Sequence, residues 1–194
     1  MENLWTDANL VPFPSIGAFA GLRSAEIERL DWAKVDLEGG YITVDASIAK
    51  TNSRRLVPIV PNLMAWLADY KKPHGKVLEL PNVVNALKRL VTATRPPAAE
   101  DAEKLPPPAV AWKHNALRHS FCTYRLADVK SAAQVALEAG NSPQMIFEHY
   151  CELVTEKAAK AWFAITPEAA KAVKARVEKE RAAKIAAFPA KAAA

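Results

Sequence analysis

Three short segments concentrate the residues of this chain that could carry out a reaction: Gly-Leu-Arg-Ser-Ala-Glu-Ile-Glu-Arg-Leu at 21–30, Asn-Ala-Leu-Arg-His-Ser-Phe at 115–121 and Gly-Asn-Ser-Pro-Gln-Met-Ile-Phe-Glu-His-Tyr at 140–150. Phosphoryl transfer spreads negative charge over phosphate oxygens, and planar guanidinium groups such as those of Arg23 and Arg118 stabilise that charge through paired hydrogen bonds. A tyrosine such as Tyr150 has an ordinary pKa of about 10, so its attack at neutral pH needs proton removal or cationic neighbours. These residue types therefore suit phosphoryl transfer to a tyrosine.

The order and spacing of the three segments resemble those of tyrosine recombinases of the phage-integrase type, over about residues 19–163. The resemblance includes a further group of residues: Ala49-Lys50-Thr51, Arg54, Arg55 and Val57-Pro58. Several motifs in the right order are more specific than any one of them. The resemblance implies the catalytic fold of integrases, a mainly helical α+β domain with a small antiparallel β-sheet.

The resemblance also implies a role for each matched residue. Arg23 and Arg118 would grip the non-bridging oxygens of the scissile phosphate. Lys50 would protonate the departing 5′ oxygen, and Tyr150 would attack the phosphorus to form a covalent 3′-phosphotyrosyl intermediate. Because this intermediate conserves the bond energy of the cut strand, rejoining would require neither ATP nor an essential metal, and we expect no cofactor.

We therefore expect a site-specific recombinase that binds double-stranded DNA as a homo-oligomer, for integration or excision of a mobile element. Four further residues are expected to bind DNA: Arg54, Arg55, Lys113 and His119. Family members generally carry an N-terminal helical domain that clamps DNA from the opposite side. We expect this chain to be a fragment or a reduced form, with weaker and strongly salt-sensitive DNA binding because it makes fewer phosphate contacts.

Two positions depart from the family pattern. Asn115 stands where histidine is common two residues before the Leu-Arg pair, and Asn141 stands where histidine or tryptophan commonly follows glycine. Asparagine can hydrogen-bond to a phosphate oxygen but cannot accept a proton near neutral pH. We include both asparagines among the catalytic residues, and we expect positioning of the phosphate to survive while acid-base assistance weakens. A helix directs His119 about 100° away from Arg118, which favours a structural or phosphate-adjacent role for this histidine.

The two asparagines also motivate an alternative, a DNA-binding or assembly module of the same fold that has lost catalysis. A second alternative is a topoisomerase-like activity that relaxes DNA with little sequence selectivity. Each candidate residue has an ordinary structural interpretation as well. Arg23 and Glu26 could form a helix-end ion pair, Tyr150 could be a partly buried core residue, and charges at Lys50 could protect a strand edge.

The apolar pattern predicts the elements that position these residues. Helical spacing over 14–32, with Ser24 as a helix cap, places Arg23 beside a helix start. Alternation over 41–48 and a second strand over 56–60 predict a β-hairpin with Lys50 near its tip. Further helices are predicted over 61–70, 82–93, 112–128, 131–139 and 143–150, with a proline-rich connector over 94–110.

Length and composition limit the class of protein. The 194 residues suit one catalytic domain, which we place at 1–165, followed by an Ala/Lys-rich helical tail at 166–194. A net charge of +5 mildly favours a polyanionic partner. Cys122 and Cys151 lie far apart and in no metal-ligand spacing, which favours unpaired thiols, no metal site and a reducing cytoplasm. No segment approaches the roughly 18 apolar residues of a membrane span, so we expect no membrane association.

Overall fold

The structure is a computed structural model that describes residues 10–49, 53–79, 113, 115–151 and 153–187, together with residues 85, 88, 91 and 92. Lys50 lies outside the described residues, as do the predicted connector over 94–110 and most of the predicted helix over 82–93. Within the described part, helices dominate and the strands form one small antiparallel sheet. The predicted fold class is confirmed.

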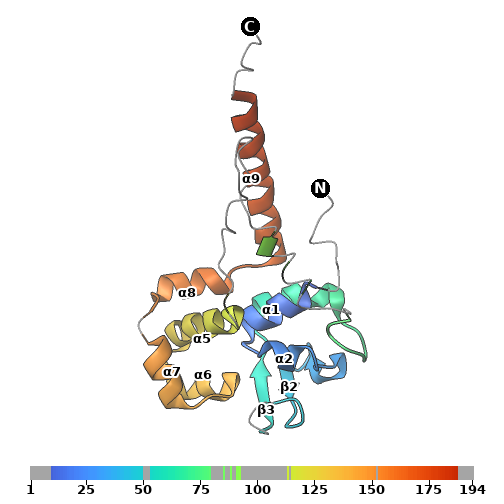
Figure 1. Ribbon diagram of the computed structural model, residues 1–194, viewed down its shortest axis with the longest axis vertical. Coiled ribbons are helices and arrows are strands. Elements are labelled where there is room, and N and C mark those ends of the chain that lie inside the picture. The colour runs from blue at the N-terminus through green and yellow to red at the C-terminus, as the bar shows by residue number, and fades with distance from the viewer. Residues whose placement is uncertain are drawn as a thin grey trace.

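The first half of the described chain forms short helices around the sheet (Figure 1). The strands are β1 (Val35–Asp36), β2 (Tyr41–Val44) and β3 (Arg55–Pro58), ordered β1-β2-β3. In the register Ile42 lies opposite Val57, and both side chains are fully buried. The helical elements are α1 (Pro12–Phe19), α2 (Ser24–Ile27), η1 (Trp32–Lys34), α3 (Pro61–Leu67) and η2 (Ala68–Tyr70).

The second half is a helical group in which α5 is central (Figure 1). Its helices are α5 (Ala116–Val129), α6 (Ala132–Ala139), α7 (Pro143–Tyr150) and α8 (Glu156–Phe163). In Figure 1, α6 and α7 lie on one side of α5, and α8 lies on the other. α9 (Pro167–Ala187) projects away from the rest of the molecule, and Val173 and Val177 on it are half exposed.

Apolar side chains gather into two clusters that meet along α1 and α5. The larger cluster joins α1, α2, the sheet and α3, and the smaller one joins α5, α6 and α7. Phe163 packs against both clusters. The three sequence segments of interest meet where these clusters adjoin, since Arg23 and Arg118 both bond to Asn141 there.

Several predicted boundaries change in the structure. The helical spacing over 14–32 corresponds to two helices, α1 and α2, and the predicted helix start beside Arg23 is present. Arg23, not Ser24, is the cap residue that precedes α2. The chain turns at Gly21, whose φ of +66° is unstrained only for glycine and whose missing side chain leaves room for the Phe121 ring. The strand expected to reach residue 48 ends at Val44, because Asp45 accepts backbone hydrogen bonds that start a turn.

The two helices α6 and α7 agree with the prediction. α6 begins after Ser131, and α7 begins after Ser142. Both serine side chains accept a hydrogen bond from a backbone N–H in the first turn, which is the usual role of a helix cap. Among the described residues, no helix is both long and apolar enough to cross a membrane.

Candidate active site

Arg23 reaches from the start of α2 to the turn between α6 and α7. Its Nη2 donates to the carbonyl oxygen of Gly140 and to Oδ1 of Asn141, each at 3.0 Å. Its Nη1 donates to Oε1 of Glu26, also at 3.0 Å. The predicted ion pair between Arg23 and Glu26 is therefore present, and the same guanidinium also makes contacts 117 and 118 residues away in the sequence.

Arg118 approaches Asn141 from α5. This arginine is 6% exposed, and its Nη1 donates to the carbonyl oxygen of Gly21, while its Nη2 donates to Oδ1 of Asn141 at 3.0 Å. Burial lowers the pKa of Arg118 to about 10, and the like charges of Arg23 and Arg55 act in the same direction. The guanidinium still carries its charge at neutral pH, since that pH lies well below its pKa.

The two arginines thus share one acceptor, Oδ1 of Asn141. Guanidinium groups can only donate, so the oxygen of the amide, and not its nitrogen, must face them. An oxygen with partial negative charge lies at the point where two positive groups converge. Two guanidinium groups arranged in this way can stabilise negative charge on a single oxygen.

A buried carboxylate positions Arg23. Glu26 is 1% exposed and accepts hydrogen bonds from Arg55 at 2.7 and 3.2 Å, in addition to those from Arg23. Burial alone would raise the pKa of Glu26, but the hydrogen bonds and charges of Arg55 and Arg23 outweigh it and lower that pKa below its ordinary value. Glu26 is therefore ionised at neutral pH and balances the two neighbouring positive charges.

Arg55, predicted to bind DNA, has several hydrogen-bond partners within the protein. Its side chain is 8% exposed, its Nε donates to the carbonyl oxygen of Glu138, and its two Nη atoms donate to Glu26. The arginine thereby joins β3 to α2 and to the end of α6. Glu26 lies 29 residues away, and strand alternation cannot reveal such a tertiary partner.

Asn115 precedes α5 as its cap residue, and its side chain bonds to Ser24. Its φ of 54° lies in the left-handed region, which asparagine tolerates better than most residues. Its Oδ1 accepts from Oγ of Ser24 at 3.3 Å and from the backbone nitrogen of Ser24 at 3.5 Å. Asn115 therefore joins the start of α5 to the start of α2. The same contact links the segment that carries Arg118 to the segment that carries Arg23.

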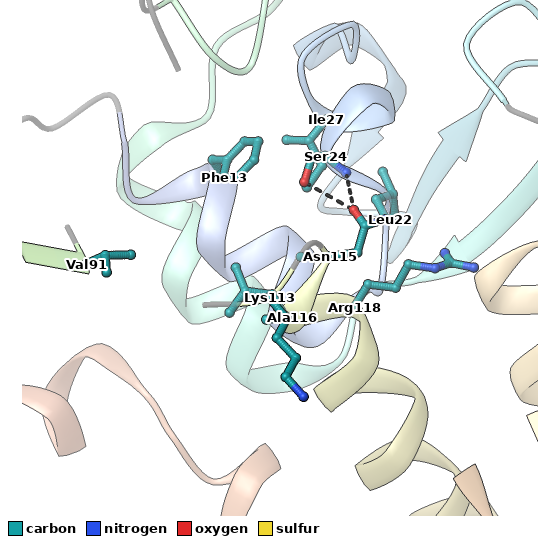
Figure 2. Close-up of a pocket in the computed structure, with 11 residues that line it drawn as sticks. Phe13, Leu22, Ser24, Ile27, Val91, Lys113, Asn115, Ala116 and Arg118 are labelled. Atoms are coloured by element: carbon teal, nitrogen blue, oxygen red, sulfur yellow. Dashed lines mark hydrogen bonds between the residues drawn. The ribbon is translucent and has the colours of Figure 1, made fainter. Parts of the chain in front are cut away.

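A cavity of about 160 Å³ lies beside this contact. Figure 2 shows the bonds between Asn115 and Ser24 at its centre, with Phe13 and Val91 on one side and the Arg118 side chain extending away on the other. Lys113, predicted to bind DNA, also lines the cavity and is exposed. The lining of the cavity is mostly apolar. Asn141, on which the two arginines converge, does not line the cavity.

Tyr150 is the last residue of α7 and is 9% exposed. Its hydroxyl lies 2.8 Å from Nδ1 of His119. Burial raises the pKa of Tyr150 above its ordinary value, and the thiol of Cys122 adds to this effect. The positive charges of Arg118 and Arg23 act in the opposite direction, so the tyrosine and both arginines share one electrostatic neighbourhood.

The contact of His119 with Tyr150 was not predicted from the sequence. His119 was predicted to bind DNA, in a structural or phosphate-adjacent role, because a helix directs it away from Arg118. That rotation is present, but α7 packs across α5 and brings Tyr150 to the histidine instead. A contact between two helices 31 residues apart has no signature in the local sequence pattern.

The structure therefore brings together most, but not all, of the predicted catalytic residues. Hydrogen bonds join Arg23, Arg118 and Asn141, and Tyr150 lies within the field of the arginines. Lys50 lies outside the described residues, and Arg54 is exposed beside that segment. Within the described ranges, no three His, Cys, Asp or Glu side chains are placed to hold a metal ion.

Comparison with solved structures gives matches to tyrosine recombinases and integrases. One is the XerA recombinase, with a TM-score of 0.54 and 16% identity over 82% of this chain and 59% of that one. Another is the Tn1549 transposon integrase in complex with transposon right-end DNA, with a TM-score of 0.54 and 18% identity over 89% of this chain and 60% of that one. The same integrase in complex with a circular-intermediate DNA has a TM-score of 0.53 and 19% identity, over 79% and 57% of the two chains.

These matches confirm that the fold is the one that the sequence motifs predicted. The chain spans about three fifths of the length of these solved structures. No protein-family model matches the chain, and no curated protein sequence does. The likeness is therefore one of fold, and the roles of individual residues depend on the geometry of the site.

Proposed function

We propose that this chain is the catalytic part of a tyrosine recombinase, which cuts and rejoins DNA strands through a covalent bond between Tyr150 and a 3′ phosphate. The observation that carries the proposal is the convergence of Arg23 and Arg118 on a single oxygen, 3.0 Å from a nitrogen of each. Two charged donors fixed in advance around one point stabilise charge on a phosphate oxygen without reorganising during the reaction.

The reaction has four bond changes. The hydroxyl oxygen of Tyr150 loses its proton and bonds to phosphorus, while the bond between phosphorus and the 5′ oxygen breaks. The 5′ oxygen leaves with the electron pair and takes up a proton, for which Lys50 is the donor expected from the family resemblance. Rejoining is the reverse sequence, in which the free 5′ hydroxyl attacks the phosphotyrosine.

Each protein group then has one task. Arg23 and Arg118 bind the non-bridging oxygens and stabilise their charge in the transition state. Glu26 and Arg55 hold Arg23 in place, and Asn141 holds the site in the geometry that a phosphate oxygen takes over when DNA binds. We further propose that the chain acts as an oligomer on double-stranded DNA in the movement of a mobile element, consistent with the transposon integrase among the structures of similar fold.

Covalent capture tests this proposal. The protein is incubated at low salt with nicked duplexes that carry randomised sites, and adducts that survive denaturation are counted. Tyr150→Phe removes the nucleophile and should abolish the adducts while leaving DNA affinity within about twofold. Tyr124→Phe is a matched control, because Tyr124 lies on α5 and is stacked on Trp162 at 4.4 Å instead of lying in the arginine field.

The outcomes separate the alternatives. Adducts that are lost only in Tyr150→Phe support the recombinase. DNA binding without adducts, beside a recombinase that reacts under the same conditions, would support a binding module that has lost catalysis. Relaxation of supercoiled plasmid at no preferred site would support a topoisomerase-like activity with the same nucleophile.

A further inference from the structure

Strand cleavage by Tyr150 needs a group that removes the proton of its hydroxyl. The tyrosine is buried, and burial holds its pKa above the ordinary value despite the nearby arginines. The two positions where histidine is common in the family are Asn115 and Asn141, and an amide cannot accept a proton near neutral pH. Both amides also have other partners, since Asn115 contacts Ser24 and Asn141 accepts from the arginines.

His119 is positioned to remove the hydroxyl proton of Tyr150. Its Nδ1 lies 2.8 Å from the hydroxyl oxygen of Tyr150, within the reach of a general base that contacts its nucleophile directly. Nδ1 accepts the hydroxyl proton when the neutral ring carries its own proton on Nε2. The His119 side chain is exposed, so the positive charge that it gains can be hydrated.

We propose that His119 is the general base of strand cleavage, taking the proton of Tyr150 as the tyrosine oxygen bonds to phosphorus and returning it during rejoining. This inference rests on the proposed recombinase function. The O–H bond of Tyr150 breaks, its proton goes to Nδ1 of His119, and its oxygen forms the bond to phosphorus. The electron pair of the broken P–O bond leaves with the 5′ oxygen, which is protonated in turn.

The charged and titratable groups described near Tyr150 come from several helices. Arg118 and Cys122 lie on α5 with His119, and Arg23 acts from the start of α2. His149 lies beside Tyr150 on α7, with its ring edge-on to the tyrosine at 6.4 Å between centroids. From α6, the carboxylate of Glu138 is engaged by Arg125, and α1 presents no titratable side chain to this side of α5. The arginines stabilise the tyrosinate and His119 takes its proton.

The experiment measures the single-turnover rate of adduct formation against pH, from 5 to 9, with a nicked duplex that reacts with the wild-type protein. The key variant is His119→Asn, because the amide oxygen can still accept the hydrogen bond from Tyr150 but cannot take the proton. His119→Ala removes both. His149→Ala is the matched control, since it removes the other histidine next to Tyr150. DNA affinity and thermal unfolding are measured for every variant.

We expect His119→Asn to bind DNA normally and to form adducts about 100- to 10,000-fold more slowly than the wild type, the usual size of a general-base contribution. The wild-type rate should fall as the pH is lowered through the range in which histidine gains its charge. His119→Asn should lose this acid limb, and its rate should rise with pH across the whole range. His149→Ala should keep the wild-type profile.

Two results would overturn the inference, and they differ in whether the proposed function also fails. Adducts formed by His119→Asn at the wild-type rate, with an unchanged acid limb, would show that His119 only positions Tyr150 and would leave the proposed function intact. A wild-type protein that binds DNA but forms no adduct would overturn both the general base and the proposed function. Because asparagine preserves the polar contact, a folding defect in His119→Ala does not affect the test.

Discussion

Arg23 and Arg118 are each held by several hydrogen bonds from different parts of the chain, whereas the hydroxyl of Tyr150 is joined to the single ring of His119. The arginine region is a buried network that includes Glu26. The tyrosine region is a contact between α5 and α7, in which Tyr150 is buried and His119 is exposed. The arginine arrangement that we propose to bind phosphate is therefore part of the buried fold, whereas the proposed nucleophile and its base meet at a contact between two helices.

This difference predicts two kinds of variant. Changes in the arginine network should alter stability as well as cleavage, because buried charges and acceptors lose their partners. Changes at the tyrosine contact should alter the rate of cleavage and leave stability almost unchanged. Measuring unfolding and adduct formation on the same variants tests whether the two regions separate in this way.

The largest expected effect is at Arg118. Arg118→Ala should abolish detectable adducts and destabilise the protein, because it leaves the carbonyl oxygen of Gly21 and Oδ1 of Asn141 without this donor. Arg118→Lys keeps the charge but loses the planar fork, and should slow cleavage by roughly 100- to 1,000-fold. Arg29→Lys, an exposed position in the first motif, is the control and should match the wild type. Normal cleavage by Arg118→Lys would contradict the role of the guanidinium.

Glu26→Gln should have the next largest effect and should show most clearly in stability. Removing one partner of a buried ion pair costs about 3–5 kcal/mol, and here Arg23 and Arg55 both lose their counter-charge. Chemical denaturation of this variant and of the exposed Glu28→Gln control measures the difference. Equal stability of the two variants would show that the buried network does not hold the site.

The same carboxylate makes stability depend on pH. Because the pKa of Glu26 is lower in the folded chain than its ordinary 4.5, the unfolded chain binds more protons at this group in acid. Its contribution is complete above the unfolded pKa and is lost as the pH falls through the lowered folded pKa. The wild type should therefore lose more stability below about pH 4.5 than Glu26→Gln does.

Gly140→Ala should have the smallest effect, and Gly40→Ala provides its matched control. Both glycines have positive φ, +66° and +75°, so alanine is strained by about 1–3 kcal/mol at either position. A side chain at Gly140 would also lie 3.0 Å from Nη1 of Arg55, whereas nothing lies within 4 Å at Gly40. Gly140→Ala should thus slow adduct formation in addition to lowering stability. A cleavage rate equal to that of Gly40→Ala would argue against the positioning role of Arg55.

The sequence predicted those parts of the molecule that local rules determine. The helix α7 was predicted with its observed bounds, because Ser142 caps it and Pro143 is suited to its first turn. The β-hairpin was predicted, but β2 is shorter than expected because Asp45 starts a turn that alternation does not reveal. The helix start beside Arg23 was predicted, but the packing of Phe121 against Gly21 in the turn before it is a tertiary contact that the local pattern does not show.

The candidate site was predicted less completely, for a similar reason. The motifs identified Arg23, Arg118, Asn141 and Tyr150, and the structure places these four in one neighbourhood. They could not identify the partner of Arg55 or the contact between His119 and Tyr150. Both contacts join elements that are distant in the sequence, and both depend on how helices and strands pack.

The central claim is tested most directly by identifying the residue that carries DNA. Adducts formed by the wild-type protein are digested with nuclease and protease, and mass spectrometry locates the nucleotide that remains. We predict a phosphodiester linkage on Tyr150 and on no other residue. A nucleotide on another side chain, such as the exposed Tyr41 or the stacked Tyr124, would contradict the assignment of the nucleophile.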